Sequence, residues 1–521
     1  PPRSLGIIIR CGPPVVGPPI GKDVISGGTK PWKRRQTRLL GMTRSPGLVV
    51  RWCRTYASKA ERFVQRISPE TLPRGYLVAS TYAGVKKAIS PGTSSVPMSK
   101  PDMALVVSSV PASVAGVFTT NAFRAAPVVH ATTALQQAGP DARVRAVLTN
   151  SGCANAVTGE AGLDDTRALV DQVRASLAPS SECTPTDVLM MSTGVIGVRL
   201  PVPPMQRAIE DLVSGRLLQN HPEAWLDVAR AFMTTDTFPK LRTRSFSLGG
   251  RQCRIAGIDK GAGMIHPRMA SASSALHATM LGLFATDAPI ATPDLQRCLN
   301  EAVRVSFNCV SVDGDMSTND TVVALANGQA TAEDGSVPDE WWTEKSHPDL
   351  VRAFQAELTA LCTEMAQLLV RDGEGAEKFV QVRVRNAGTY EQAHAIAASI
   401  STSALVKCAM HGEDANWGRI LCAAGYAALP APAWAVDPSK VHVTFEPPPG
   451  VQEAPLPTLI DGVPQVVDEA HAARLLQHED IYVDVDLQGG TWRREEAVAE
   501  AVYWTCDFSK EYITINGDYR T

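Results

Sequence analysis

A threonine that follows a small residue stands at the start of an apolar run, within the segment KGAGMIHPRMASASSALHATMLGLFA, which spans Lys260 to Ala285. Ala278 precedes Thr279, and a strand-like stretch from Met280 to Phe284 follows. A small preceding residue leaves its carbonyl carbon open to attack by the next hydroxyl. Cleavage of this bond would give Thr279 a free α-amine with a reference pKa of about 7.7 to 8.0, which can act as a general base near neutral pH. These residue types indicate a self-cleaving precursor with an N-terminal threonine nucleophile.

The same residues also fit a simpler interpretation. Threonine is β-branched and favours strands, so Thr279 before an apolar run is more typical of an ordinary strand start. From the residue types and their spacing alone, the strand start is the favoured interpretation.

A family resemblance favours the nucleophile. KGAGMIHP followed by ATMLGLFATDA resembles the autoprocessing segment of the ornithine acetyltransferase (ArgJ) family, in which Met-Ala leads directly into the nucleophilic Thr. Here Met269-Ala270 is followed by Ser271, and Thr279 comes eight residues after Ser271. Because the Met-Leu-Gly that follows the family's nucleophile follows Thr279 here, we assign the nucleophile and the cleavage site to Ala278-Thr279. Ser271 stays a possible substitute, and the additional SASSALHA is either a real insertion or a gene-prediction error.

A second motif with chemical potential is Ser192-Thr193-Gly194, which follows the apolar run from Asp187 to Met191. A strand that runs into a glycine turn can aim backbone N–H groups and a hydroxyl at a common point, as an oxyanion hole requires. From the residues alone an ordinary turn is the simpler interpretation. The resemblance makes Thr193 and Gly194 the oxyanion-hole pair.

The resemblance also implies a set of substrate-binding residues. Thr237 ends a threonine cluster that would otherwise be interpreted as a helix cap. Lys260 is expected to meet the substrate α-carboxylate as a point charge. Glu374 lies on the glycine loop DGEGA and is expected to meet a cationic amine, with a solvated turn as the alternative. Asn516 and Thr521 are placed in the pocket by the resemblance, although chain ends are ordinarily frayed.

The resemblance covers about Leu72 to Thr521 and implies a fold and an activity. The implied fold class is α/β, a mixed-sheet ArgJ/DmpA-like fold, autoprocessed into an α chain (57–278) and a β chain (279–521), usually two of each in a heterotetramer. The implied reaction moves an acetyl group from N-acetylornithine to glutamate through an acetyl-threonine intermediate, in arginine biosynthesis. Many fungal-type members also make N-acetylglutamate from acetyl-CoA, here a co-substrate rather than a bound cofactor.

Two other functions stay open. One is an N-terminal-nucleophile amidase or aminopeptidase, in which water replaces glutamate as the acceptor. The other is an unprocessed, non-catalytic paralogue, which the additional residues beside the cleavage site motivate, since a displacement of about 1 Å at a reacting centre lowers rates about a hundredfold.

Composition, net charge and cysteine spacing argue against several classes of protein. The chain has 521 residues, 44% of them hydrophobic, and a net charge of -3, which argues against a nucleic-acid-binding protein. No apolar run approaches the roughly eighteen residues of a membrane span, so no membrane partner is expected. The 11 cysteines include no C-x-x-C pair, which indicates neither a metal site nor a disulfide framework and fits a reducing compartment.

The first sixty residues are basic and contain one acid, Asp23. Met42 opens a basic, acid-free run typical of organelle transit peptides, so we expect the true start at Met42, a cut near Tyr56 and a location in the mitochondrial matrix. Residues 1–56 are expected to be an extension and transit peptide. A basic disordered arm is the alternative.

The elements that must position these residues can be predicted from apolar periodicity. Two adjacent strands joined by a short turn are expected at Met103–Val107 and Val114–Phe118, and a hairpin turn at Gly249-Gly250. Helices are expected from Glu223 to Phe232 and from Asp349 to about Leu369. Residues 328–347, which include Trp341 and Trp342, are expected to form a surface insertion. The acidic run 313–320 lacks the length and terminal Glu of a calcium loop and is expected to be a turn.

Overall fold

Two mixed β-sheets with helices between and around them form the part of the chain that this computed structural model describes. The described residues are 58–89, 100–119, 121–177, 187–214, 217–267, 269–271, 280–429, 436–489 and 499–518. Several predicted positions lie outside them: Met42, Tyr56, Ala278, Thr279 and Thr521.

The first sheet has ten strands, and its main path runs β11-β6-β8-β10-β2-β3-β4. Off this path β1 and β7 pair with β2, and β5 pairs with β6. The pairs β8–β10 and β3–β4 are parallel and the others antiparallel. The strands are β1 Tyr76–Thr81, β2 Met103–Phe118, β3 Arg143–Cys153, β4 Val188–Val195, β5 Lys240–Leu248, β6 Arg251–Lys260, β7 Ala270–Ser271, β8 Leu281–Thr286, β10 Thr321–Ala326 and β11 Thr331–Ala332.

The second sheet has seven strands in the order β15-β14-β13-β16-β12-β17-β9. Here β12–β16 and β17–β9 are parallel. The strands are β9 Val310–Ser311, β12 Phe379–Ala387, β13 His442–Glu446, β14 Leu456–Ile460, β15 Val463–Pro464, β16 Asp480–Asp486 and β17 Ala499–Cys506.

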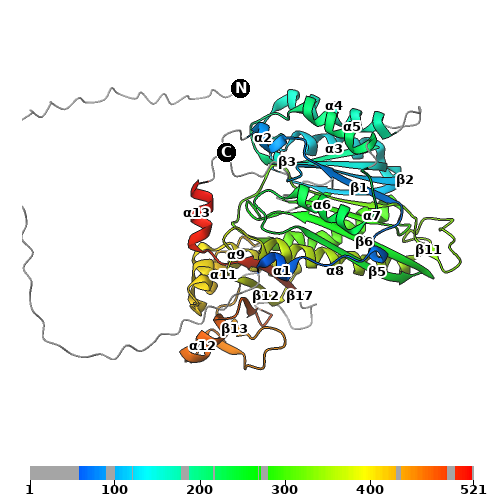
Figure 1. Ribbon diagram of the computed structural model, residues 1–521. Coiled ribbons are helices and arrows are strands. Elements are labelled where there is room, and N and C mark those ends of the chain that lie inside the picture. The colour runs from blue at the N-terminus through cyan, green and yellow to red at the C-terminus, as the bar shows by residue number, and fades with distance from the viewer. Residues whose placement is uncertain are drawn as a thin grey trace, which may run out of the picture. The chain divides into compact units, whose positions relative to one another are not determined.

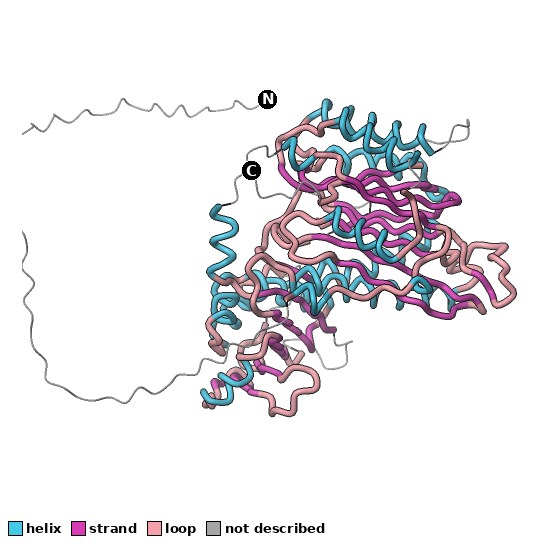
Figure 2. The backbone as a smooth tube through the Cα atoms, viewed as in Figure 1, coloured by secondary structure: helices cyan, strands magenta, loops and turns pink. Residues whose placement is uncertain are grey.

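Helices cover both sheets (Figures 1 and 2). Helices α7 and α8 pack on each other, with α7 against β2 and α8 against β5, β6 and β17, so α8 connects the two sheets. Helix α9 packs on β12 and β17, and α13 stands at one edge of the fold (Figure 1). The α-helices are α1 Lys59–Phe63, α2 Val85–Ile89, α3 Ala126–Ala138, α4 Gly159–Leu177, α5 Val202–Ser214, α6 Pro222–Phe232, α7 Thr292–Arg304, α8 Pro348–Arg371, α9 Tyr390–Thr402, α10 Ala404–His411, α11 Trp417–Gly425, α12 Glu469–Leu476 and α13 Lys510–Asp518.

Strand β8, which follows the predicted nucleophile, is buried on both faces. Leu281, Leu283 and Ala285 belong to the core that α6 closes, whereas Phe284 belongs to the core around α7 and α8. A strand covered on both faces is apolar throughout rather than alternating. This explains why Met280 to Phe284 is a continuous apolar run.

Several sequence predictions are confirmed. The helices predicted from Glu223 and from Asp349 are α6 and α8, and Gly249-Gly250 is the turn between β5 and β6. One prediction is wrong. The two predicted strands are one 16-residue strand, β2, because the segment between Val107 and Ala112 is a register shift opposite β3 rather than a turn. Pro111 is tolerated in a strand at such an irregularity.

The predicted surface insertion is also only partly correct. The side chain of Trp342 is 4% exposed and belongs to the core around α7 and α8. Its backbone N–H donates to Pro289 O at 2.6 Å, and its carbonyl accepts from Ala291 N at 3.0 Å. Because its neighbours in the sequence are polar, the burial of Trp342 could not be predicted from the sequence.

No single helix of the described residues is both long and apolar enough to span a membrane. Helices α9 and α10, bent by 60° where they meet, pass that test only together and only by length and composition.

Candidate active site

A pocket of about 210 Å³ collects residues from distant parts of the described chain. Five residues that the sequence singled out line it: Thr193, Gly194, Lys260, Glu374 and Asn516. They come from the end of β4, the end of β6, the loop after α8, and α13. The other lining residues are Ile196, Thr234, Thr235, Gly263, Met264, Met280, Leu281, Ser317, Asn319 and Asp320.

The end of β4 holds Thr193 and Gly194 rigidly at one wall of the pocket. Gly194 has φ +133°, and a Cβ there would lie 2.3 Å from the carbonyl carbon of Gly152, so only glycine fits. Asn319 fastens this wall from another element, since its Nδ2 donates to Ser192 O at 2.8 Å and to Ala154 O at 2.6 Å. The peptide groups around Thr193 and Gly194 are therefore preorganised, as stabilisation of a developing oxyanion requires.

Lys260 supplies the positive charge of the pocket. It ends β6, is 8% exposed, and its Nζ donates to Thr193 Oγ1 at 3.3 Å. Burial lowers the pKa of Lys260 from its ordinary value, and the nearby Asp236 carboxylate acts in the opposite direction. A buried ammonium next to the Thr193 hydroxyl is suited to binding an anionic group of a substrate.

A buried charge network lies behind Lys260. Lys240 Nζ donates to Asp236 Oδ1 at 2.7 Å and to Asp372 Oδ2 at 2.6 Å, and all three side chains are fully buried. Asp236 Oδ1 also accepts from Gly261 N at 2.7 Å. The two carboxylates raise the pKa of Lys240 despite its burial. This network fixes the chain directly after Lys260.

Thr237, predicted to bind substrate, belongs to this network rather than to the residues that line the pocket. Its hydroxyl donates to Asp372 Oδ1, and its N–H lies 3.2 and 3.1 Å from the two oxygens of Asp372. Thr234 and Thr235 from the same cluster line the pocket instead. Repeated threonines give no sequence signal for which one faces the cavity.

Glu374 is set against the glycine loop that follows β6. Its N–H donates to Ala262 O at 2.8 Å, and its Oε2 accepts from Asn516 Nδ2 at 2.9 Å. A Cβ on Gly263 would lie 2.4 Å from that same Oε2, so the glycine is needed for this approach. The contact from α13 brings the C-terminal segment to the pocket, as the sequence predicted for Asn516.

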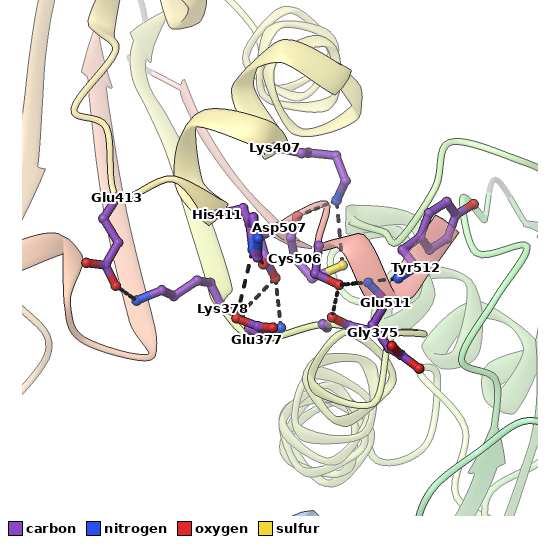
Figure 3. Close-up of polar contacts among 12 residues, drawn as sticks. Gly375, Glu377, Lys378, Lys407, His411, Glu413, Cys506, Asp507, Glu511 and Tyr512 are labelled. Carbon is purple, nitrogen blue, oxygen red and sulfur yellow. Dashed lines mark hydrogen bonds and ion pairs between the residues drawn. The ribbon is translucent and has the colours of Figure 1, made fainter. Parts of the chain in front are cut away.

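The chain after Glu374 is anchored by the end of β17 (Figure 3). Asp507 Oδ1 accepts from Glu377 N at 2.9 Å and Lys378 N at 2.8 Å, and His411 Nδ1 lies 2.8 Å from Asp507 Oδ2. Glu377, His411 and Asp507 hold ligand atoms within 4.8 Å of one another, a spacing that could accept a metal ion. Because Asp507 already has three partners here, we assign the group to anchoring the loop.

The acidic run 313–320, predicted to be a turn, borders the pocket. Ser317, Asn319 and Asp320 line it, and Asp313 accepts from Met264 N at 2.6 Å and from Ile265 N at 2.9 Å. The signal that could have identified this run is its position directly before β10, the parallel partner of β8.

The predicted nucleophile itself, Thr279, and its neighbour Ala278 lie outside the described residues, as does Thr521. Met280, the next residue after Thr279, is described and lines the pocket. Its carbonyl accepts from Thr321 N at 2.8 Å, which fixes the start of β8 against β10. The backbone of Ser271 pairs with Val117 of β2, and its side chain is outside the described part.

The fold and the pocket together define an α/β enzyme whose site offers a lysine for an anion, carboxylates for amines and a rigid strand end for a developing negative charge. Comparisons with known proteins identify the family. Residues 83–521 match the ArgJ family, and the chain belongs to it. The family that the sequence predicted is therefore confirmed.

Curated relatives from fungi match nearly the whole chain. The arginine biosynthesis bifunctional protein ArgJ, mitochondrial, of Malassezia globosa is 66% identical over 497 residues, which are 89% of this chain and 97% of the relative. The protein of the same name from Cryptococcus neoformans var. neoformans serotype D is 49% identical over 470 residues, 88% of this chain and 93% of the relative. The expected mitochondrial location and membership of arginine biosynthesis are confirmed by these relatives.

Solved structures include family members from bacteria. The arginine biosynthesis bifunctional protein argJ of Bacillus halodurans is 32% identical and covers 45% of this chain and 96% of its own, with a TM-score of 0.38. Ornithine acetyltransferase of Mycobacterium tuberculosis, complexed with ornithine, is also 32% identical and covers 38% of this chain and 95% of its own, with a TM-score of 0.31.

Proposed function

We propose that this protein is an acetyltransferase that moves an acetyl group from N-acetylornithine to glutamate through an ester on Thr279. The observation that carries the proposal is the convergence of Thr193, Gly194, Lys260 and Glu374 on the pocket that Met280 lines. Met280, which follows the proposed nucleophile in the sequence, is itself a lining residue.

In the first half-reaction Thr279 Oγ attacks the acetyl carbonyl, and the α-amine of Thr279 takes the hydroxyl proton. The oxyanion of the tetrahedral intermediate is held at Thr193 and Gly194. The bond from the acetyl carbon to the ornithine nitrogen then breaks, the α-amine returns its proton to that nitrogen, and ornithine leaves. An acetyl ester stays on Thr279.

In the second half-reaction the amine of glutamate attacks the ester carbonyl. The α-amine of Thr279 takes a proton from the attacking nitrogen and passes it to Thr279 Oγ as the C–O bond breaks, and N-acetylglutamate leaves. Both substrates carry an α-carboxylate, and Lys260 is the pocket residue that would bind it in both half-reactions. Glu374, with its partner Asn516, would meet the side-chain ammonium of the ornithine substrate.

Acetyl-CoA is proposed as a second acetyl donor, which would make the enzyme an N-acetylglutamate synthase as well. The word bifunctional in the names of the relatives supports this activity. With acetyl-CoA as the only donor, formation of N-acetylglutamate confirms it, and no product above the uncatalysed rate contradicts it.

Thr279 has a free α-amine only after the peptide bond between Ala278 and Thr279 is cleaved. We propose that residues 1–56 are removed on import and that Ala278-Thr279 is cleaved autocatalytically, giving an α chain (57–278) and a β chain (279–521). Two of each would form a heterotetramer. Strand β6 of the proposed α chain pairs with β8 of the proposed β chain, and this interleaving would hold the cleaved chains together.

The covalent intermediate gives the test of the mechanism. With N-acetylornithine labelled in the acetyl group and no glutamate present, label should accumulate on the peptide that begins with Thr279, and initial rates should give parallel double-reciprocal lines. Thr279→Ala is the matched control and should take up no label. Intersecting double-reciprocal lines together with an unlabelled Thr279 peptide would contradict the acetyl-ester intermediate. Release of free acetate in the absence of glutamate would favour a hydrolase.

A further inference from the structure

Helix α1 and the residues around it join parts of the fold that are far apart in the sequence. We call residues 58–65 the α1 segment. Its members Ala60, Phe63 and Val64 pack against the core around α7 and α8. The segment lies before residue 83, where the match to the family begins, and the acetyl-transfer mechanism uses none of its residues.

The α1 segment is bound to strand β5 in the proposed α chain. Arg242 Nη2 donates to Phe63 O at 2.9 Å, and Thr243 N donates to Gln65 Oε1 at 3.2 Å. The centroid of the Phe63 ring also lies 5.6 Å from that of Phe238, just before β5. These contacts fix the segment against the strand that follows the threonine cluster.

The same segment contacts the proposed β chain. The Arg371 guanidinium, at the end of α8, lies over the Phe63 ring at 5.5 Å from its centroid, so α1 is placed beside α8 (Figure 1). Arg62 forms an ion pair with Glu479 at 2.8 Å. The α1 segment therefore holds parts of both proposed chains together near the loop after α8.

A hydrogen bond from Lys59 reaches the loop that carries Glu374. Lys59 Nζ donates to Ala376 O at 3.0 Å, two residues after Glu374. Burial lowers the pKa of Lys59, as expected of an amine that is enclosed by protein. The carbonyl of the preceding residue, Gly375, accepts from Ser509 Oγ at 2.6 Å. Successive carbonyls of this loop are therefore held by the α1 segment and by the residue before α13.

We infer that Lys59 is a positioning residue for substrate binding: through the Ala376 carbonyl it holds the loop that presents the Glu374 carboxylate to the pocket. The inference rests on the proposed function, in which Glu374 meets the side-chain ammonium of the ornithine substrate. It implies that the proposed removal of residues 1–56 must leave Lys59 in place, because loss of the α1 segment would loosen this loop.

A looser loop should weaken substrate binding more than it slows the chemical step. Glu374 meets a part of the substrate that does not react, so its displacement raises KM and leaves kcat nearly unchanged. Residues that act through one another have non-additive effects. The effect of replacing Lys59 should therefore disappear when the carboxylate of Glu374 is already absent.

The test compares Lys59→Met with wild type and with the matched control Arg66→Met, which removes the same charge from an exposed residue next to the α1 segment. For Lys59→Met we expect hydrogen exchange of the amides of residues 374–378 to be about tenfold faster. We also expect KM for N-acetylornithine to be about 3- to 10-fold higher, with kcat within about twofold of wild type. Arg66→Met should match wild type. In a Glu374→Gln background, Lys59→Met should raise KM by less than about twofold.

Unchanged exchange of these amides in folded Lys59→Met overturns the inference. Faster exchange with an unchanged KM, or a KM effect that persists in full in the Glu374→Gln background, also overturns it. If Lys59→Met does not fold, Lys59→Gln, which removes the charge and keeps a polar side chain, is judged by the same measurements. Exchange is measured without substrate, so the two proposals fail separately: loss of acetyl transfer in wild type contradicts the proposed function, whereas unchanged exchange contradicts the role of Lys59.

Discussion

Gly263 and Glu374 approach so closely that a Cβ on residue 263 would lie 2.4 Å from Oε2 and 2.5 Å from Cδ of the glutamate. The carboxylate therefore rests directly on the backbone of the glycine loop that follows Lys260. This contact joins the segment before the predicted cleavage site to the loop after α8. The position of the pocket carboxylate thus depends on the absence of a side chain at residue 263.

Gly263→Ala should weaken substrate binding without unfolding the protein. The backbone of Gly263 is not in the left-handed region, so the added Cβ meets only the movable end of Glu374. We expect KM for N-acetylornithine to rise about tenfold, equivalent to about 1.4 kcal/mol, with little change in the melting temperature. Steady-state kinetics and thermal unfolding measure both. An unchanged KM would show that Glu374 does not bind the substrate.

Gly194→Ala should damage both the fold and catalysis. At this residue φ is +133°, and the Cβ would clash with the backbone of Gly152 and Cys153. We expect a loss of stability of about 3 kcal/mol or more, and in the fraction that folds a kcat lower by about a hundredfold. Gly197→Ala is the matched control: φ is +83° with nothing within 4 Å of the Cβ, so the loss should be about 1 to 2 kcal/mol. Equal losses in the two variants would contradict the packing argument.

Lys240→Met should be among the most destabilising single substitutions behind the pocket. It leaves Asp236 and Asp372 buried without their cation, and breaking a buried ion pair in this way costs about 3 to 5 kcal/mol. Arg352→Met is the control, because its pair with Asp349 is exposed and contributes about 0 to 1 kcal/mol. Denaturant unfolding of both variants gives the comparison, and a loss below 1 kcal/mol for Lys240→Met would contradict the assigned network.

The alkaline side of the pH profile should report Lys260. Burial lowers the pKa of Lys260, so the ammonium that binds the α-carboxylate is present below this lowered pKa and is lost as pH rises through it. We expect kcat/KM to decline at a pH below the ordinary lysine value of 10.5. Lys260→Arg should abolish this decline, because a guanidinium stays charged, while lowering kcat/KM through its different shape. A decline that persists in the arginine variant would assign it to another group.

Sequence reasoning singled out five of the fifteen residues that line the pocket, because these five lie in short motifs that resemble a family. Lys260, Glu374 and Asn516 were found from loop motifs that resemble a family, and the structure gathers them around one cavity. Helices α6 and α8 were predictable because their apolar spacing persists over several turns.

The other features of the pocket and core depend on tertiary contacts, which the apolar periodicity of a sequence does not report. Asp313 to Asp320 has the composition of a turn, and only the parallel pairing of β8 with β10 shows that it borders the pocket. Thr237 could not be told from Thr234 and Thr235, because identical side chains differ only in the direction that the fold gives them. The burial of Trp342 likewise comes from contacts with residues near Pro289 that are distant in sequence.

The proposed mechanism requires Thr279 to be the N-terminal nucleophile of a separate chain. Intact mass and N-terminal sequencing of the purified protein test it most directly. We expect two chains, one of which begins Thr-Met-Leu-Gly. A second chain that begins at Ser271 would assign the nucleophile to that serine, and a single uncut chain in an active preparation would contradict the proposed mechanism.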